Sequence, residues 1–359
     1  MSGEETMSDI ISHSKFRDRD IIRDIDGRIL VVLGYIQPTD QILAFLKYIP
    51  DASGKWASGA KRYRRAFWGD VDSVVDGIHD VPSEYVVNDS HFGTELIEVP
   101  IDYIEKHFLP EERLEEIRGD GPTDKLESQA LGLANAIHDT LGISFSDLGV
   151  AGSILWKGHN PEFSDINMNV YGFENSWILK TSYESVSNAD KVRLRKSDEW
   201  IRGVERILAR VPNLSREDID KLFERRFAFY YDNQCIGVTP VLRPEESPIQ
   251  YGSESYQQIS DLPITLTFVV EDSRYGLFSP SIVEGRSSII DESEGTRISR
   301  LLIYEGIYNG LFKAGDLLEV TGTLQRVSSR RGNQDDFYQL MIGTKTGAGK
   351  EYIRLLNSP

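Results

Sequence analysis

The residues best suited to chemistry lie in one short stretch near the middle of the chain, where a turn precedes a polar strand. Gly152 and Ser153 form the turn, and eleven residues separate Ser153 from Asp165. From Asp165 onward polar and apolar residues alternate, which predicts a strand with Asp165 and Asn167 on one face. Carboxylates hold divalent cations and a small backbone turn binds phosphates, so this spacing indicates metal-assisted phosphoryl transfer.

The stretch over residues 148–172 resembles the signature of the polymerase-β-like nucleotidyltransferase superfamily. In that superfamily Gly-Ser or Gly-Gly is followed, after a similar gap, by two acids that flank one apolar residue on a strand. Residues 315–324 and 351–356 are similar to the C-terminal region of an archaeal group of predicted nucleotidyltransferases, so the resemblance covers most of the chain. It implies an α+β fold in which helices accompany a nucleotidyltransferase-like mixed sheet.

The resemblance also implies a role for each of the four residues. Gly152 and Ser153 would bind the phosphates of a nucleoside triphosphate, while three acids would hold two Mg²⁺ or Mn²⁺ ions. Asp165 matches the first acid, a ligand of the ion on the triphosphate side. Asn167 stands where the acid that bridges both ions belongs, and its neutral amide leaves a second cation poorly compensated.

The third acid is expected on a strand at residues 235–242. Gly237 fits the position best, and no residue of that segment is acidic. Asp232, just before the strand, is the nearby acidic residue and therefore the substitute candidate for a metal ligand. Two of the three metal-binding acids are thus missing from their expected places.

These departures leave several functional interpretations open. An active enzyme would move a nucleotide from a triphosphate to a nucleic-acid end or another acceptor. A degenerate member would keep the fold and bind a nucleoside triphosphate, or RNA or DNA, without efficient turnover. A structural subunit would have a protein partner but no ligand here, and a further alternative is that Asn167 is an introduced substitution for an acid. We favour binding without efficient catalysis, because the charge that two cations need is missing.

Two basic clusters with aromatic neighbours are candidates for nucleic-acid contact, since cations track phosphates and aromatic rings stack on bases. The first contains Lys61, Arg62, Arg64 and Arg65 beside Tyr63, Phe67 and Trp68, and the second contains Arg326, Arg330 and Arg331 near Phe337 and Tyr338. The alternative for the first cluster is a solvated strand end whose aromatics pack inward. The alternative for the second is an ordinary arginine-bearing loop.

Composition limits the classes of function. The net charge of −17 argues against broad adhesion to nucleic acid or to anionic membranes. Cys235 is the single cysteine, so neither an intrachain disulfide nor a cysteine-based zinc site can form, which fits a cytoplasmic protein. The sequence has no apolar run of about 18 residues, so we expect no membrane span. His79, His91, His107, His138 and His159 are scattered without metal-ligand spacing, and we interpret each as an ordinary histidine.

A length of 359 residues predicts two or three domains. Residues 1–18 read as a polar tail, 19–118 as an N-terminal β-rich domain, and 119–245 as the nucleotidyltransferase-like domain. The boundary between these domains is placed at residues 118 and 119, where a Gly-Asp-Gly-Pro break begins. Residues 246–262 read as a linker, and 263–359 as a small closed β-barrel of OB type.

Periodicity predicts the elements that position the site. Strands are expected over 28–36, 41–49, 264–270, 299–304, 317–324 and 337–342. A helix should begin at Asp124, with Glu127 completing a capping box, and deliver the chain to the Gly152 turn. Further helices are expected to begin at Ser197 and Ser215.

Overall fold

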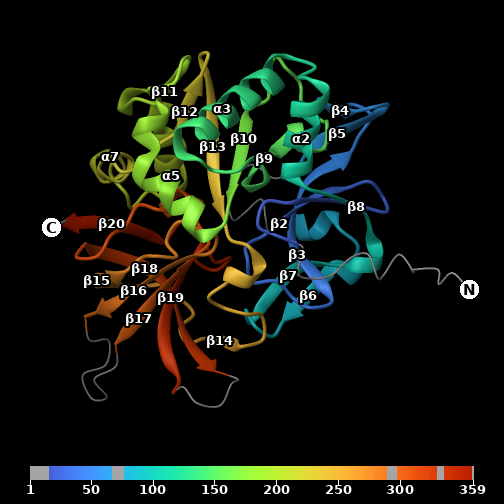
Figure 1. Cartoon of the computed structure of the whole chain (residues 1–359). Coiled ribbons are helices and arrows are strands. Elements are labelled where there is room, and N and C mark those ends of the chain that lie inside the picture. Colours follow the sequence, from blue (N-terminus) through green and yellow to red (C-terminus); the bar gives the residue numbers. More distant parts are fainter. Residues whose placement is uncertain (1–15, 67–76, 289–296, 330–334, 358–359) are drawn as a thin grey trace, which may run out of the picture. The chain divides into compact units, whose positions relative to one another are not determined.

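The computed structural model describes residues 16–66, 77–288, 297–329 and 335–357 (Figure 1). These residues form two compact units that are interleaved along the chain. The first unit draws on the segments Met1–Val87, Glu95–Leu194 and Ala228–Ser247, and the second on Asn88–Thr94, Arg195–Phe227 and Pro248–Pro359. The class is α+β with three sheets, as the sequence predicts.

The N-terminal sheet has eight strands. They are β1 (Ile21–Asp24), β2 (Ile29–Val32), β3 (Gln41–Pro50), β4 (Trp56–Ser58), β5 (Lys61–Arg65), β6 (Val86–Asp89), β7 (Thr94–Pro100) and β8 (Ile104–Phe108). The main path runs β4-β5-β3-β2-β1-β8, while β7 pairs with β3 and β6. Strands predicted over 28–36 and 41–49 are confirmed as the antiparallel pair β2 and β3.

Both faces of the N-terminal sheet are covered, because its strands alternate apolar side chains to each side. One face buries Phe16, Ile22, Leu30, Val32, Ile42, Ala44, Leu46, Tyr85, Ile97, Val99 and Ile104. The opposite face buries Ile21, Ile29, Val31, Phe45, Tyr48 and Tyr63 together with Leu155 and Trp156. We call this second face the inner face, since it packs against the residues that follow the Gly152 turn. The prediction of a polar tail over residues 1–18 is wrong for its last residues, because Phe16 and Asp18 are buried.

The second sheet of this unit is mixed, as the resemblance implies. Its strands are β9 (Leu148–Ala151), β10 (Ile166–Tyr171), β11 (Val192–Leu194), β12 (Phe229–Tyr231) and β13 (Gln234–Val241), in the order β11-β12-β13-β10-β9. β10 and β13 are parallel, whereas the other neighbours are antiparallel. The helices of the unit are α2 (Pro110–Asp120), α3 (Lys125–Leu141), α4 (Gly152–Leu155) and α5 (Phe173–Val186), and α3 and α5 pack on β10 (Figure 1).

Helix α2 crosses the predicted domain boundary. It continues through residues 118 and 119 to Asp120, because Leu114 and Ile117 are buried and hold its last turns in place. Helix α3 begins as predicted, with Asp124 Oδ1 accepting from the backbone N–H of Leu126 and Glu127. Glu127 does not complete the expected capping box; its carboxylate accepts instead from Thr123 N and Oγ1.

The second unit contains a barrel built from residues 254–357. Its strands are β14 (Glu254–Gln258), β15 (Ile264–Asp272), β16 (Ser281–Ser287), β17 (Ile298–Ile303), β18 (Leu317–Ser329), β19 (Phe337–Ile342) and β20 (Tyr352–Asn357). β18 pairs with both β15 and β19, so β15-β16-β17-β19-β18 close a ring of pairings, and β14 and β20 extend β18. Four of these strands were predicted. The prediction that residues 246–262 form a linker is wrong for β14, because this strand pairs with β18 and belongs to the sheet.

Two helices complete the second unit. They are α6 (Ile201–Arg210) and α7 (Arg216–Phe223). The prediction at Ser215 is confirmed, since its hydroxyl accepts from Asp218 N and caps α7. Ser197 begins only a short 3-10 turn, after which α6 starts at Ile201. The 3-10 turns of the chain are η3 (Gly77–Asp80), η4 (Ser83–Tyr85), η5 (Ile101–Tyr103), η6 (Phe145–Asp147), η7 (Ser197–Trp200), η8 (Pro244–Glu246) and η9 (Gly306–Tyr308).

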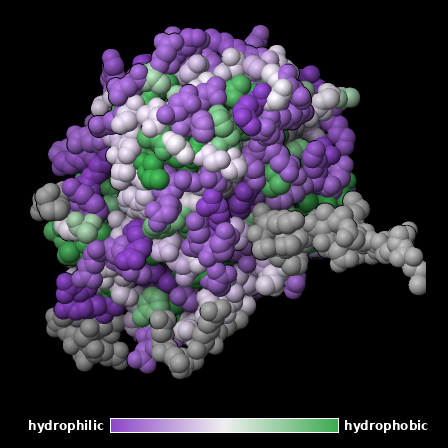
Figure 2. All heavy atoms as spheres, viewed as in Figure 1, coloured by the Kyte–Doolittle hydropathy of each residue, from purple (hydrophilic) through white to green (hydrophobic). Residues whose placement is uncertain are grey.

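The surface is mostly hydrophilic on the face in view, with hydrophobic residues in small separate groups (Figure 2). The large exposed apolar side chains are scattered along the sequence, for example Ile25 and Leu262. Within the described ranges, no helix combines the length and the apolar character that crossing a membrane would require.

Candidate active site

The Gly152 turn is built at the end of a buried strand. β9 ends at Ala151, and Gly152 opens the short helix α4 with a left-handed backbone, φ 65°. A Cβ atom on Gly152 would lie 3.1 Å from Asn167 Nδ2, which is closer than side chains normally pack. Both the positive φ and the near approach of Asn167 therefore favour glycine here. Ser153 follows as a buried residue with 5% exposure.

Asn167 is the centre of the site. It lies on β10 between two strands, paired with Ala151 of β9 on one side and with Gly237 of β13 on the other. A Cβ atom on Gly237 would lie 3.5 Å from Asn167 Oδ1, with no other contact within 4 Å among the described residues. The structure thus brings together Gly152, Asn167 and Gly237, the positions that the resemblance assigns to the turn, the second acid and the third acid.

Asp165 precedes β10 and is exposed. Strand alternation places it on the same side as Asn167, as the sequence predicts. Burial raises the pKa of Tyr48 in the N-terminal sheet to about 12, and the carboxylate of Asp165 contributes in the same direction. Asp165 therefore lies beside the inner face of that sheet.

Asp232 is not brought to the site. It occupies the two-residue turn between β12 and β13 with φ 45°, followed by Asn233 with φ 65°. It precedes Gly237 by five residues, which is about 16 Å along a strand. The parallel register aligns Gly237 with Asn167, so the candidate third ligand lies well away from Asn167.

The first basic cluster divides between the two faces of β5. Tyr63 is buried against Trp156, with ring centroids 4.9 Å apart, so its aromatic ring packs inward. Arg62 and Arg64 point to the other side, where Arg62 Nε donates to Gly54 O (2.8 Å). Arg64 Nη2 lies 3.3 Å from Asp80 Oδ2.

The remaining members of the first cluster differ in exposure. Lys61 is exposed, whereas Arg65 is half-buried on the same side of β5 as Tyr63. Phe67 and Trp68 lie outside the described residues. The first cluster therefore does not form one continuous basic surface.

The second basic cluster is described only in part. Arg326 of β18 has Nη2 2.6 Å from Asp336 Oδ2 and is half-exposed. Arg330 and Arg331 lie outside the described residues. Phe337, the neighbouring aromatic, is covered by the guanidinium of Arg300 at 4.8 Å from its ring centroid.

Sequence reasoning did not single out Lys47, although a lysine inside the apolar run 41–49 is the available signal. Burial, followed by the charges of Arg65 and Arg19, lowers the pKa of Lys47 to about 8, while Asp165 acts in the opposite direction. Arg65, Arg19 and Asp165 therefore each lie within electrostatic reach of Lys47.

A second group that the sequence did not reveal joins Asp124, Glu127 and His159, whose ligand atoms lie within 4.8 Å of one another. His159 is 35 residues from Asp124, so its spacing gave no signal, yet its Nε2 lies 2.6 Å from Asp124 Oδ2. Asp124 caps α3, and Glu127 is bonded to Thr123 and ion-paired with Arg113. Since these carboxylates already have donors, we interpret the group as the network that begins α3.

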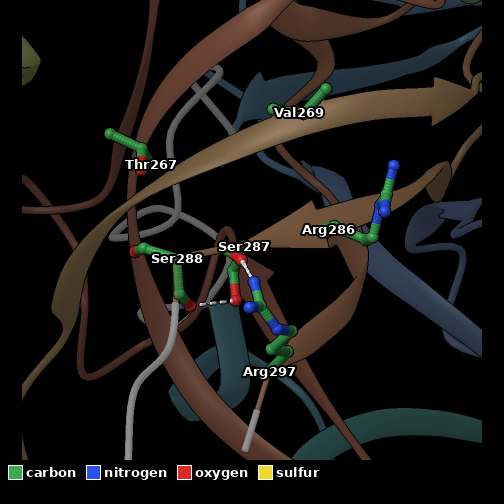
Figure 3. Close-up of a pocket in the computed structure, with 6 residues that line it drawn as sticks. All are labelled: Thr267, Val269, Arg286, Ser287, Ser288 and Arg297. Carbon is green, nitrogen blue, oxygen red and sulfur yellow. Dashed lines mark hydrogen bonds between the residues drawn. The ribbon is translucent and has the colours of Figure 1, made fainter. Parts of the chain in front are cut away.

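An open groove of about 380 Å³ lies on the barrel beside β15 and β16. Its lining comprises Thr267, Val269, Arg286, Ser287, Ser288 and Arg297 (Figure 3). Arg297 Nη1 donates to Ser287 O (3.0 Å), and Arg286 pairs with Glu271 at 2.5 Å. Both arginines therefore already have acceptors inside the unit.

Comparison with known proteins gives a distant relative. The chain is 22% identical over 370 residues to the uncharacterized protein MJ1086 of Methanocaldococcus jannaschii, and the alignment covers 95% of this chain and 99% of that protein. No protein-family model matches the chain. No solved structure matches it either. The similarity extends over both units.

Proposed function

We propose that this chain is a nucleotidyltransferase-type protein that binds a nucleoside triphosphate without efficient transfer. One observation carries the proposal: Asn167 on β10 lies between the Gly152 turn, which directly follows β9, and Gly237 on β13, the arrangement that the resemblance implies. A left-handed glycine turn at the end of a strand presents backbone N–H groups to a phosphate. The exposed Asp165 lies on the same side of the sheet.

The residues present do not fit a pair of divalent ions. Between the two strands, Asn167 supplies an uncharged amide and Gly237 supplies no ligand at all. Asp165 is the single carboxylate on this side of β10, and two divalent ions held by one carboxylate would repel each other strongly. A glycine turn that is kept beside metal ligands that are missing favours nucleotide binding over catalysis.

The finer fold assignment is part of the same proposal. We infer a nucleotidyltransferase-like core around β9, β10 and β13, because a Gly-Ser turn links the antiparallel pair and the third position lies on the adjacent parallel strand. We infer an OB-type barrel from the closed five-strand ring of the second unit.

Calorimetry with each of the four common nucleoside triphosphates tests the proposed function on the full chain. Gly237→Leu should fill the open space beside Asn167 without a backbone clash and weaken binding by about tenfold or more, a loss of about 1.4 kcal/mol. Gly119→Leu is the matched control, since a Cβ there meets nothing within 4 Å and Gly119 lies at the end of α2. Equal affinity of the two variants, or no binding by the wild type, contradicts the proposal.

A further inference from the structure

The inner face of the N-terminal sheet carries a lysine at an irregular point of β3. The pairing of β2 with β3 shifts from Leu30–Leu46 to Ile29–Tyr48, so Lys47 is the extra residue of a β-bulge. Phe45 and Tyr48 both belong to the inner face. Alternation from Phe45 places Lys47 on that same side, and the bulge keeps Tyr48 there as well.

Arg65 reaches the same side from the neighbouring strand. Tyr48 of β3 pairs with Arg65 of β5, and Ala66 N donates to Lys47 O (2.9 Å), so the two cations lie on adjacent strands. Tyr63, two residues before Arg65, packs its ring against Trp156. Arg65 therefore lies on the face that Trp156 covers.

The segment after the Gly152 turn is held against this face. Tyr48 and Trp156 have ring centroids 5.2 Å apart, and Ser58 Oγ donates to Trp156 O (3.1 Å). Leu155 is buried in the same cluster. Because Gly152 lies only three residues before Leu155, the turn lies next to the inner face, and Asp165 lies near Lys47 and Tyr48 of that face.

Arg19 adds a third positive charge near Lys47. It has a left-handed backbone, φ 71°, which is uncommon for a residue with a side chain and is typical of functional positions. Its Nε atom is buried without a hydrogen bond, 3.4 Å from Asp18 Oδ2. Among the described residues, no carboxylate lies at ion-pair distance from the ammonium of Lys47.

We propose that Lys47 and Arg65, with Arg19 beside them, bind the phosphates of the nucleotide directly, so that binding at the Gly152 turn does not require a divalent ion. This inference rests on the proposed function. Because Asn167 and Gly237 stand where acids are expected, the strands beside the turn carry less negative charge. The inner face next to the turn carries the positive charges of Lys47 and Arg65. A positively charged site attracts a polyphosphate that carries no metal ion. A site with three carboxylates would instead bind the polyphosphate through divalent metal ions.

The test measures binding of ATP and of inorganic tripolyphosphate to the full chain by calorimetry, in EDTA and in excess Mg²⁺. The wild type should bind both probes in EDTA, and excess Mg²⁺ should leave each affinity unchanged or lower it, because Mg²⁺ binds the probes and reduces their negative charge. Lys47→Met should weaken both by about tenfold to a hundredfold, as expected for one lost charge-assisted contact. Lys106→Met is the matched control, because it removes the same charge at an exposed position on β8 of the same sheet.

The outcomes separate this inference from the function on which it rests. Binding that requires Mg²⁺ and is unchanged in Lys47→Met overturns the inference, while loss of that binding in Gly237→Leu preserves the proposed function. Metal-free tripolyphosphate binding that is lost in Lys47→Met but unchanged in Gly237→Leu supports the anion site and overturns the nucleotide site at the turn. Thermal unfolding of Lys47→Met shows whether a loss of binding reflects a loss of fold.

Discussion

Two positively charged residues, Arg300 in the barrel and Lys47 in the first unit, have different surroundings. In the barrel, Arg300 is 9% exposed and donates to both oxygens of Glu254, at 3.1 and 2.7 Å, and to Gln339 Oε1 at 2.7 Å. Asp316, fully buried, receives Arg225 in the same way. In the first unit, Lys47 lies within reach of Arg65 and Arg19 instead of a contacting acid.

The difference indicates which cations serve the fold and which are available to a ligand. A buried arginine that already donates to a carboxylate and an amide oxygen, as Arg300 does, gains little from a further anion, because its desolvation is compensated. A half-buried lysine among like charges is destabilised until an anion approaches it. The same residue class therefore has a structural role in the barrel and a proposed binding role at the inner face.

The largest expected effect comes from removing the carboxylate that pairs with the buried Arg300. Glu254→Ala leaves Arg300 buried without its carboxylate, and we expect the barrel to lose about 3–5 kcal/mol of unfolding free energy. Urea unfolding followed by tyrosine and tryptophan signals measures the loss. Glu271→Ala is the control, since its pair with Arg286 is exposed and should contribute less than about 1 kcal/mol. Equal losses in the two variants would contradict the structural role of Arg300.

The second prediction restores acids to the first unit. Asn167→Asp combined with Gly237→Asp places two carboxylates beside each other, and the open space at Gly237 accepts the new side chain. We expect Mn²⁺ affinity and metal-dependent nucleotide transfer to rise on the order of a hundredfold, since each tenfold requires about 1.4 kcal/mol.

The single variants and a third change make the restoration test sharper. Asn167→Asp alone should give little gain, because Gly237 still offers no ligand. Asp165→Ala in the double variant should cancel the gain. Strong rescue by Asn167→Asp alone would mean that another acid completes the site, with Asp232 the first candidate despite its place in the β12–β13 turn. Robust transfer by the wild type would contradict the degenerate site.

The smallest expected effect concerns Lys47 and pH. Its folded pKa of about 8 lies below the unfolded value of about 10.4, so the folded state binds fewer protons in that window. Stability of the wild type should therefore rise with pH between about 8 and 10.4. Lys47→Met removes this cost and should gain about 1–2 kcal/mol at pH 7, after allowance for the solvent contact of the side chain.

The measurement is the difference in unfolding free energy between wild type and Lys47→Met across this pH range. The two proteins should converge only above about pH 10.4, where the lysine is uncharged in both the folded and the unfolded state. A gain that stays constant with pH would mean that packing alone, and not the charge of Lys47, destabilises the wild type.

Local signals in the sequence predicted much of the fold. Asp124 and Ser215 were identified as helix starts because their short polar side chains cap the following N–H groups, and both caps are present. The strand at Asn167 followed from its alternation. The domain boundary predicted at residues 118 and 119 is wrong, because α2 continues to Asp120. Buried Leu114 and Ile117 hold the helix in place, and the Gly-rich residues that suggested the boundary give no sign of this packing.

The candidate site could be predicted where its residues lie in one stretch of sequence. It could not be predicted where the positions of residues depend on how strands pair. Gly152, Ser153 and Asp165 lie in one stretch, so their spacing was visible. The alignment of Asn167 with Gly237 fitted the resemblance, but only the strand register separates Gly237 from Asp232. Lys47 was visible only as a lysine inside an apolar run. Its position beside Arg65 depends on the β-bulge and on the opposite cluster at Trp156, which leave no pattern in the sequence.

The interleaving of the two units also constrains how the protein is made. Strands β11 and β12 are neighbours in one sheet, yet residues 195–227, which belong to the other unit, separate them along the chain. A nascent chain that has reached residue 194 therefore lacks β12 and β13 and cannot complete the strand on which Gly237 lies. Synthesis must pass through part of the second unit before the first can close, so neither unit corresponds to a single continuous fragment that would fold as it leaves the ribosome.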